Sequence, residues 1–258
     1  MTRSVDLPSA LTARDLLAER LRSGKLVVAL DYDGTLCPIV ERPEAAAMSE
    51  AMRRTLDQLT GRCPVVVLSG RGLDDLRTRV SVERAWCSGC HGFEIAGPER
   101  AYVHPAAARC EPLLVSLADE LEASLGDMAG VVIERKRYAV AVHLRMVAAE
   151  QRERVEEAVK VARPGLACKR GHQVYEFVPE AEWNKGRALE WIIDALGRSD
   201  VFPVFIGDDR TDEDAFLAVR DRGLAIVVST APRATAATMR LSGPDEVYAL
   251  LETLAGGC

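Results

Sequence analysis

The sequence predicts an α/β protein: a doubly wound parallel sheet forms the core, and a second, smaller α/β unit is inserted into it. Three continuous apolar runs predict the parallel sheet, because strands covered on both faces are apolar along their whole length. These runs span residues 25–30, 64–68 and 202–206. Each run ends in small or polar residues and is followed by a helical pattern, and this alternation is typical of a doubly wound sheet.

The predicted core uses both ends of the chain. An amphipathic helix is expected near the N-terminus, with Leu16, Leu17 and Leu21 on one side. The remaining core elements are helices at 49–60, 73–80, 184–196 and 212–219, a strand at 224–228 and a last helix at 244–254. We expect the polar residues that follow the strands to meet at one edge of the sheet, where such sheets bind ligands.

The middle of the chain has a different pattern. Apolar Val140 and Val142 alternate with Ala141 and His143, which is typical of an antiparallel sheet with one solvated face. The expected order is a helix at 109–125, strands at 130–134 and 138–145, a helix at 150–161, and strands at 166–169 and 173–178. We therefore predict a core formed by residues 1–99 and 179–258, and an inserted unit formed by residues 100–178.

Composition excludes several classes of protein. Of the 258 residues, 48% are hydrophobic and 28% charged, as in soluble globular proteins. The net charge of −6 disfavours a nucleic-acid partner, because phosphate binding requires a positive surface. No apolar run approaches the ~18 residues of a membrane span, and the N-terminal residues lack the apolar stretch of an export signal. We expect a cytoplasmic protein without a membrane partner, whose seven cysteines are free thiols.

Carboxylates follow two of the predicted strands. Asp31 and Asp33 end the first apolar run, and Asp208, Asp209 and Asp212 follow the third. Carboxylates gathered at one sheet edge repel one another unless a cation lies between them, and Mg²⁺ prefers such oxygen ligands. Aspartates at strand ends also cap the next helix. Two clusters together favour a Mg²⁺ site.

Hydroxyl and basic groups complete this predicted edge. Ser69 and Arg71 follow the second apolar run, and Lys185 begins a predicted helix. A hydroxyl, backbone N–H groups and a guanidinium suit a phosphoryl group, and a lysine adds a point charge. We therefore expect Ser69, Arg71 and Lys185 to bind phosphate.

The motifs DYDGTL, SGR, a helix-leading lysine and GDDRTD resemble, in that order, the four motifs of the haloacid dehalogenase superfamily of phosphotransferases. The resemblance implies a Rossmann-like core in which Asp31 is the nucleophile and becomes an aspartyl phosphate. It implies that Asp33 acts first as general acid and then as general base. The implied Mg²⁺ ligands are Asp31, the backbone carbonyl of Asp33, Asp208 and, in support, Asp212.

Over nearly its full length the chain resembles trehalose-6-phosphate phosphatases. The matching segments are DYDGTLCPIV, SGR, HGFE, ERKRYAVAVHLR, VYEFVP followed by NKG, and GDDRTDEDAF. The resemblance implies a monomeric hydrolase of trehalose 6-phosphate that works alongside a trehalose-6-phosphate synthase, with the inserted unit as a substrate-binding cap domain. The implied sugar-binding residues are His91, Gly92, Glu134, Lys136, His143, Arg145, Glu176 and Asp209. His172 stands where some members of the family have lysine, so a related sugar phosphate, such as sucrose phosphate or mannosylglycerate phosphate, stays open.

The predicted sugar site has a plausible geometry. Glu134 and Lys136 lie two residues apart on one strand, as do His143 and Arg145 on the next, so each pair shares a face. Carboxylates accept hydrogen bonds from sugar hydroxyls, and the basic groups donate to them. The alternative is a solvated face with cross-strand ion pairs. We expect the insert to close over the core through hinges near residues 96–104 and 178–182.

One motif suggests a different class of protein. The stretch CSGCHGFE, residues 87–94, has the C-x-x-C-H spacing of c-type haem attachment. It lacks a second C-x-x-C pair that would complete a zinc site. Because HGFE is the part that matches the family, we interpret it as a substrate loop in which Glu94 holds the backbone. A haem protein and a non-catalytic sugar-phosphate sensor remain the alternative functions.

Overall fold

The structure is a computed structural model that describes residues 2–40, 42–160, 163–171, 173–198 and 200–256. The chain divides into two compact units. The core unit comprises residues 1–101 and 183–258, and the insert unit comprises residues 102–182.

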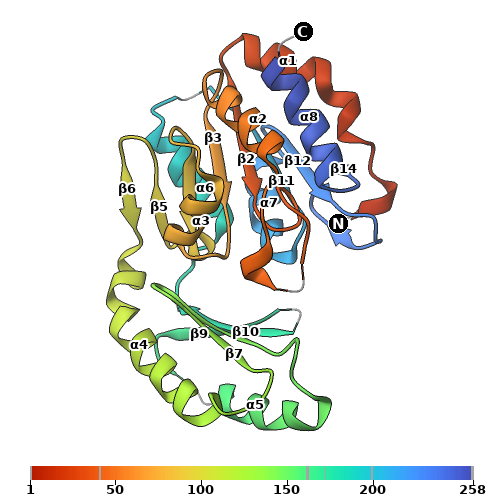
Figure 1. The fold of residues 1–258 in the computed structure, drawn as a ribbon. Helices are drawn as coiled ribbons and strands as arrows, with labels where there is room; N and C mark the ends of the chain where they lie inside the picture. Colours follow the sequence, from red (N-terminus) through yellow and green to blue (C-terminus); the bar gives the residue numbers. More distant parts are fainter. Residues whose placement is uncertain (1, 41, 161–162, 172, 199, 257–258) are drawn as a thin grey trace. The chain divides into compact units, whose positions relative to one another are not determined.

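The core unit is built on an eight-stranded sheet with the order β14-β12-β11-β2-β3-β4-β5-β6 (Figure 1). The strands from β14 to β4 are parallel, and β5 is antiparallel to β4. Their bounds are β2 Leu26–Asp31, β3 Val65–Leu68, β4 Trp86–Gly89, β5 Glu94–Ala96, β6 Ala101–Val103, β11 Phe202–Gly207, β12 Leu224–Val228 and β14 Met239–Leu241. The three apolar runs in the sequence are β2, β3 and β11, which lie side by side, so the predicted parallel core is confirmed.

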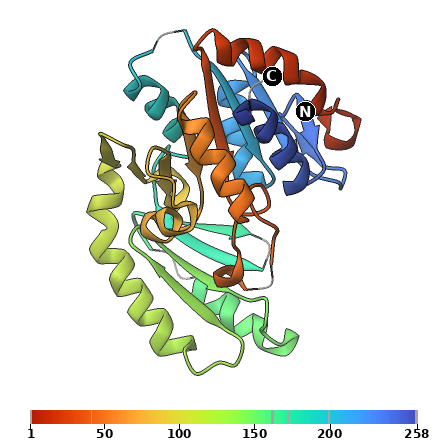
Figure 2. The ribbon, with the colours of Figure 1, turned by 45° about the horizontal axis from the view of Figure 1, so that its top comes forward.

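Helices cover both faces of this sheet. On one face lie α1 Arg14–Arg22, α2 Glu50–Thr60, α3 Leu73–Val80 and α8 Pro244–Gly256. Figure 2 shows α8 beside α2, although residues 61–243 separate them in sequence. On the other face lie α6 Lys185–Ala195 and α7 Glu213–Val219, where the rings of Phe205 and Phe216 meet edge to face at 5.6 Å. Burial on both faces explains why the central strands are apolar throughout.

The register of the sheet brings the strand ends together. Leu30 on β2 lies opposite Ile206 on β11, and Asp31 lies opposite Leu68 on β3. The residues that follow β3 and β11 therefore flank the end of β2. The strand order also reverses at β2, and such a switch point is where open α/β sheets bind ligands.

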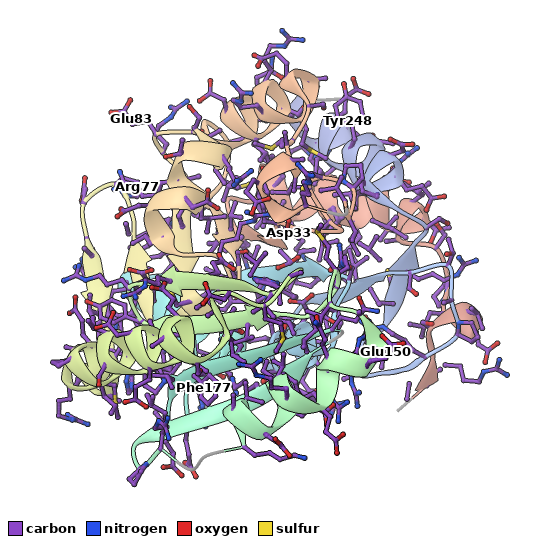
Figure 3. The ribbon with its side chains drawn as sticks, turned by 60° about the horizontal axis from the view of Figure 1, so that its bottom comes forward. Asp33, Arg77, Glu83, Glu150, Phe177 and Tyr248 are labelled. Carbon is purple, nitrogen blue, oxygen red and sulfur yellow. The ribbon has the colours of Figure 1, made fainter. Side chains whose placement is uncertain are left out.

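The insert unit has a four-stranded antiparallel sheet with the order β7-β8-β10-β9. Its elements are α4 Pro105–Leu125, β7 Val132–Lys136, β8 Ala139–His143, α5 Arg152–Val159, β9 Leu166–Gly171 and β10 Val174–Pro179. The helices α4 and α5 lie on one face of this sheet (Figures 1 and 3). Val140, Val142 and Phe177 pack with their residues. The opposite face carries the polar residues of β7 and β10.

Several predicted boundaries in the insert unit were wrong. The helix α4 begins at Pro105 rather than 109, because His104 accepts the Ala106 N–H at 3.2 Å and proline suits the first helical turn. The strand β7 begins at 132, after Gly130 turns the chain with φ of 85°. The strand β8 ends at His143, so Arg145 lies in the following turn instead of on the strand. His172 and the end of the predicted 150–161 helix lie outside the described residues.

No helix in the described part of the chain is long and apolar enough to cross a membrane.

Candidate active site

The end of β2 holds a buried ion pair. Lys185 Nζ, at the start of α6, donates to Asp31 Oδ1 at 2.6 Å and to Asp212 Oδ1 at 2.7 Å, and all three side chains are almost completely buried. Burial alone would lower the pKa of Lys185, but the charges of Asp212 and Asp31 outweigh it and raise that pKa well above its ordinary value. Lys185 is therefore a fixed positive charge beside the predicted nucleophile.

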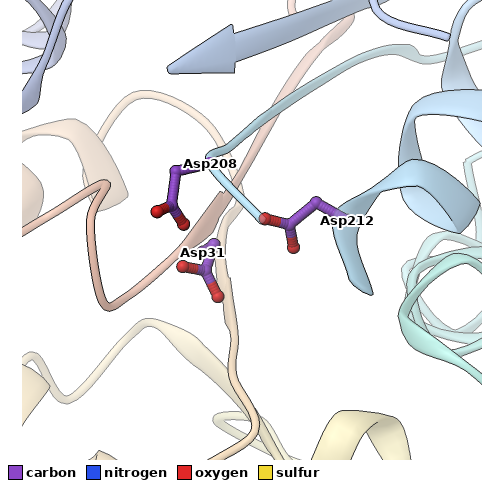
Figure 4. Close-up of side chains that lie close together, drawn as sticks. All are labelled: Asp31, Asp208 and Asp212. Atoms are coloured by element: carbon purple, nitrogen blue, oxygen red, sulfur yellow. The ribbon is translucent and has the colours of Figure 1, made fainter. Parts of the chain in front are cut away.

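Three carboxylates gather around this point. Asp31, Asp208 and Asp212 each offer an oxygen, and these oxygens lie within 4.8 Å of one another (Figure 4). Among the described residues, this is the one group of three or more histidine, cysteine, aspartate or glutamate side chains so arranged. Gly34, with φ of 81°, makes room for it, because a Cβ there would collide with the Asp208 carboxylate.

The electrostatics of this group favour a bound cation. Burial raises the pKa of Asp31 well above its ordinary value, and Asp212 and Asp208 add to the rise although Lys185 opposes it. Burial and the neighbouring Asp212 raise the pKa of Asp208 to about 7. One lysine does not balance three carboxylates. The donor set, made only of oxygens with an unbalanced negative charge, fits Mg²⁺.

Asp33 is held apart from this cluster by Arg71. The guanidinium donates from Nε to Asp33 Oδ2 and from Nη2 to Oδ1, both at 2.7 Å. It also donates from Nη1 to Asp75 Oδ2 at 3.0 Å. The guanidinium of Arg71 thus bonds to two carboxylates, and the binding of phosphate by Arg71 stays a prediction.

The loop after β3 is hydrogen-bonded to the segment that contains His91 and Gly92. Ser69 is buried, and its Oγ accepts the Arg71 N–H at 3.2 Å. The backbone N–H of His91 donates to Ser69 O at 2.9 Å, and that of Cys90 donates to Arg71 O at 2.7 Å. His91 has a φ of 57°, and its ring lies where a Cβ on Gly70 would be. The structure therefore places the predicted substrate loop directly on the predicted phosphate loop.

Two side chains that hold this loop were not among the predicted site residues. Glu94 is buried; its Oε1 accepts the Leu73 N–H at 2.7 Å and lies 3.3 Å from Cys90 Sγ. Trp183 Nε1 donates to Gly92 O at 2.7 Å. The sequence suggested only that Glu94 holds the backbone, and nothing in its pattern marked Trp183.

The cysteines of CSGCHGFE belong to the packing of the core unit. Cys87 lies on β4, and burial raises the pKa of its thiol to about 12, so it stays protonated. Cys90 is buried beside Glu94. Six cysteines are free thiols, and Cys258 lies outside the described residues.

The polar face of the insert sheet carries a connected network. Lys136 Nζ lies 2.7 Å from Glu176 Oε1 and 3.7 Å from Glu134 Oε2, and His143 Nε2 lies 2.9 Å from the same Glu134 oxygen. Burial would raise the pKa of Glu134, but the hydrogen bond from His143 and the charge of Lys136 hold it below its ordinary value. Four predicted sugar-binding residues are thus brought together on one face. Arg145 lies in the turn beyond it.

The remaining predicted residue is in the core unit. Asp209 is exposed, and its backbone N–H donates to Asp212 Oδ2 at 2.9 Å, which orients the Asp212 carboxylate.

Comparison with known protein families shows to which family the chain belongs. The trehalose-phosphatase family model matches residues 29–245, a span that contains every motif described above. The chain belongs to the trehalose-phosphatase family. The resemblance to trehalose-6-phosphate phosphatases, predicted from segments such as HGFE, ERKRYAVAVHLR and GDDRTDEDAF, is thereby confirmed.

Curated relatives agree with this family. A trehalose-phosphate phosphatase of Mycobacterium tuberculosis is 41% identical over 262 residues, covering 98% of the chain and 67% of the relative. Trehalose 6-phosphate phosphatase RA3 of Zea mays is 39% identical, covering 96% of the chain and 74% of the relative. A Mycobacterium tuberculosis protein described as an uncharacterized glycosyl hydrolase is 42% identical, but the chain spans only about a fifth of it (20%).

Solved structures share the fold. The C-terminal domain of Candida albicans trehalose-6-phosphate phosphatase superposes with a TM-score of 0.80 at 24% identity, covering 98% of this chain and 99% of that one. A trehalose-6-phosphate phosphatase related protein superposes with a TM-score of 0.77 at 25% identity, covering 90% and 97%. The predicted α/β fold of the haloacid dehalogenase type, core and insert together, is confirmed.

Proposed function

We propose that the protein is a trehalose-phosphatase, which hydrolyses trehalose 6-phosphate to trehalose and inorganic phosphate. The observation that carries the proposal is the position of Asp31: it ends β2 at the switch point of the sheet, between Lys185 and the carboxylates of Asp208 and Asp212. Membership of the trehalose-phosphatase family and the names of the curated relatives support the substrate.

In the proposed reaction, an oxygen of Asp31 attacks phosphorus and forms an aspartyl phosphate as the bond from phosphorus to the sugar oxygen breaks. Lys185 balances the charge of Asp31, and with Ser69 it contacts the phosphoryl oxygens. Asp31, Asp208 and Asp212, with the backbone carbonyl of Asp33, would hold Mg²⁺. When bound, the ion would neutralise negative charge on the transferring group and orient its oxygens.

Asp33 is proposed to move the protons. It gives a proton to the leaving sugar oxygen in the first step. In the second step it takes a proton from the water that attacks phosphorus, and the bond between phosphorus and Asp31 breaks. The carboxyl group of Asp33 then ends the cycle in its starting state.

The insert unit is proposed to recognise the sugar as a cap domain. Glu134, Lys136, His143 and Glu176 present acceptors and donors for hydroxyl groups on one sheet face, and we assign Arg145, His91, Gly92 and Asp209 to the same task from the family pattern. Domain boundaries at 99/100 and 178/179, with hinges beside them, remain part of the proposal.

We also propose that the protein works as a monomer in the cytoplasm, alongside a trehalose-6-phosphate synthase. The six free thiols in the described part of the chain support a reducing compartment.

The test is Mg²⁺-dependent phosphate release from trehalose 6-phosphate, compared with glucose 6-phosphate, sucrose 6-phosphate and mannosylglycerate phosphate. We expect trehalose 6-phosphate to have the highest kcat/KM, and we expect Asp31→Asn to lower it by at least about 1000-fold. Faster release from another sugar phosphate would move the proposal to that substrate, and release that persists in Asp31→Asn would overturn the mechanism.

A further inference from the structure

The orientation of Asp33 is controlled from outside the carboxylate cluster. Its two oxygens accept two parallel hydrogen bonds from Arg71, each of 2.7 Å, and such a bidentate pair fixes the plane of the carboxylate. Arg71 is itself nearly buried, and its guanidinium lies over the ring of Tyr32, 5.5 Å from the ring centre. Arg71 therefore determines where the Asp33 carboxyl group points.

Arg71 is anchored in turn by α3. The third donor of the guanidinium, Nη1, bonds to Asp75 Oδ2 at 3.0 Å. Arg79 Nε bonds to both oxygens of Asp75 at 2.8 Å, and Arg79 Nη1 donates to Ala46 O. Asp75 and Arg79 lie four residues apart on one face of α3, and Arg71 lies just before the N-cap residue of that helix, Gly72.

The charge of Asp75 suits this role. Burial alone would raise its pKa, but hydrogen bonds from Arg79 and Arg71 outweigh burial and hold the pKa below its ordinary value. Asp75 is therefore ionised near neutral pH and can hold a guanidinium in place. It lies on the first turn of α3 and has no part in the carboxylate group of Asp31, Asp208 and Asp212.

We propose that Asp75 is a positioning residue for phosphoryl transfer, which acts through Arg71 to hold the Asp33 carboxyl group where it exchanges protons with the leaving oxygen. The inference rests on the proposed function, because it assigns that exchange to Asp33. Without the carboxylate of Asp75, the ion pair between Arg71 Nη1 and Asp75 is lost, so Arg71 is held less firmly and Asp33 can move with it.

The leaving group supplies the test. The alcohol that leaves from trehalose 6-phosphate requires a proton, whereas 2,4-dinitrophenolate is stable as an anion and leaves without one. The ratio kcat/KM reports steps up to the first irreversible one, so it isolates the transfer to Asp31 from later hydrolysis. General acid catalysis contributes about 100- to 10 000-fold. We expect Asp75→Asn to lower kcat/KM for trehalose 6-phosphate about tenfold and for 2,4-dinitrophenyl phosphate less than about twofold.

The matched control is Asp74→Asn. Asp74 lies on the same first turn of α3 and is exposed, so this variant makes the same change in helix charge without touching Arg71. We expect Asp74→Asn to leave kcat/KM unchanged for both substrates. Asp75→Glu restores a carboxylate and should recover part of the rate with trehalose 6-phosphate, which a loss of folding would not allow.

Asp33→Asn, assayed in parallel, separates the two levels of the proposal. This variant should lower kcat/KM for trehalose 6-phosphate more than Asp75→Asn does, and it should again have little effect on kcat/KM for 2,4-dinitrophenyl phosphate. Equal losses with both substrates in Asp75→Asn, or no loss with either, would overturn the inference while Asp33→Asn remained selective. If Asp33→Asn showed no selectivity, the acid–base assignment in the proposed function would fail instead.

Discussion

Lys185 is the residue on which the charge balance of the site depends. It is the partner of two buried carboxylates, Asp31 and Asp212, each within 2.7 Å. Breaking a buried ion pair by removing one partner costs about 3–5 kcal/mol, because the remaining charge is left uncompensated. This residue therefore links the stability of the core unit to the proposed chemistry.

We predict that Lys185→Met lowers the free energy of unfolding by about 3–5 kcal/mol near neutral pH and abolishes phosphatase activity. Urea denaturation and phosphate release measure the two effects. The control is Lys25→Met, since Lys25 pairs with exposed Asp200 on the surface, where an ion pair contributes at most about 1 kcal/mol. A Lys185→Met variant as stable as the control would show that the buried pair does not balance the site.

For single residues, the sequence predicts a position at the edge of the sheet where the backbone alone determines it, and fails where a side-chain contact determines it. Asp31 and Asp208 follow buried strands, and the backbone alone carries them to the shared edge. The sequence also predicts Arg71 at this edge. Its long side chain can reach either a phosphate or a carboxylate, and the bonds to Asp33 are seen only in the structure. Asp75 gave no signal, because an acidic residue four positions from an arginine is common on exposed helices.

The four-stranded sheet of the insert unit separates two environments at alternate residues. On β7, Glu134 and Lys136 belong to the polar network, while Arg135 between them points to the other face and bonds to Glu122 of α4 at 2.6 Å. The period of two along a strand produces this division. One strand therefore offers both a test of sugar recognition and its control.

We predict that Glu176→Gln raises KM for trehalose 6-phosphate about tenfold and changes kcat/KM for 2,4-dinitrophenyl phosphate little, because it removes the negative charge that pairs with Lys136 at 2.7 Å on the proposed sugar-binding face. Steady-state kinetics with both substrates measures this. Glu122→Gln, which weakens the pair on the opposite face, should alter neither. Equal losses with both substrates would show that the network supports the fold rather than binding sugar.

Whole elements were easier to predict than their ends. The apolar runs of β2, β3 and β11 and the alternation on β8 identified the two sheets, since burial on both faces and burial on one leave different patterns. The start of α4 was not predicted correctly, because the residue that caps it is His104, and histidine is not a common helix-capping residue. Side-chain contacts such as Trp183 to Gly92 join segments far apart in sequence, and no local pattern encodes them.

For the molecule as a whole, the carboxylate group makes stability depend on pH, and the proposed Mg²⁺ would make it depend on metal as well. The pKa of Asp208 is about 7 in the folded protein, above the ordinary value of 3.8 that the unfolded chain should show. Between these values the folded protein binds the proton more tightly than the unfolded chain, so stability falls as pH rises. Mg²⁺ bound as proposed at the same oxygens would compete with that proton and would bind only the folded state.

We therefore predict that Mg²⁺ stabilises the protein more strongly at pH 7.5 than at pH 5. At a concentration about 100 times its Kd, binding contributes about 2.7 kcal/mol, which raises Tm by about 5 °C or more for a protein of this size. Thermal denaturation with and without Mg²⁺ at both pH values measures this, and the shift at pH 5 should be less than half as large. Asp208→Asn should lose the shift, whereas Asp209→Asn should keep it, because the exposed carboxylate of Asp209 lies outside the group of Asp31, Asp208 and Asp212. A shift that was equal at both pH values, or that survived in Asp208→Asn, would place the metal elsewhere.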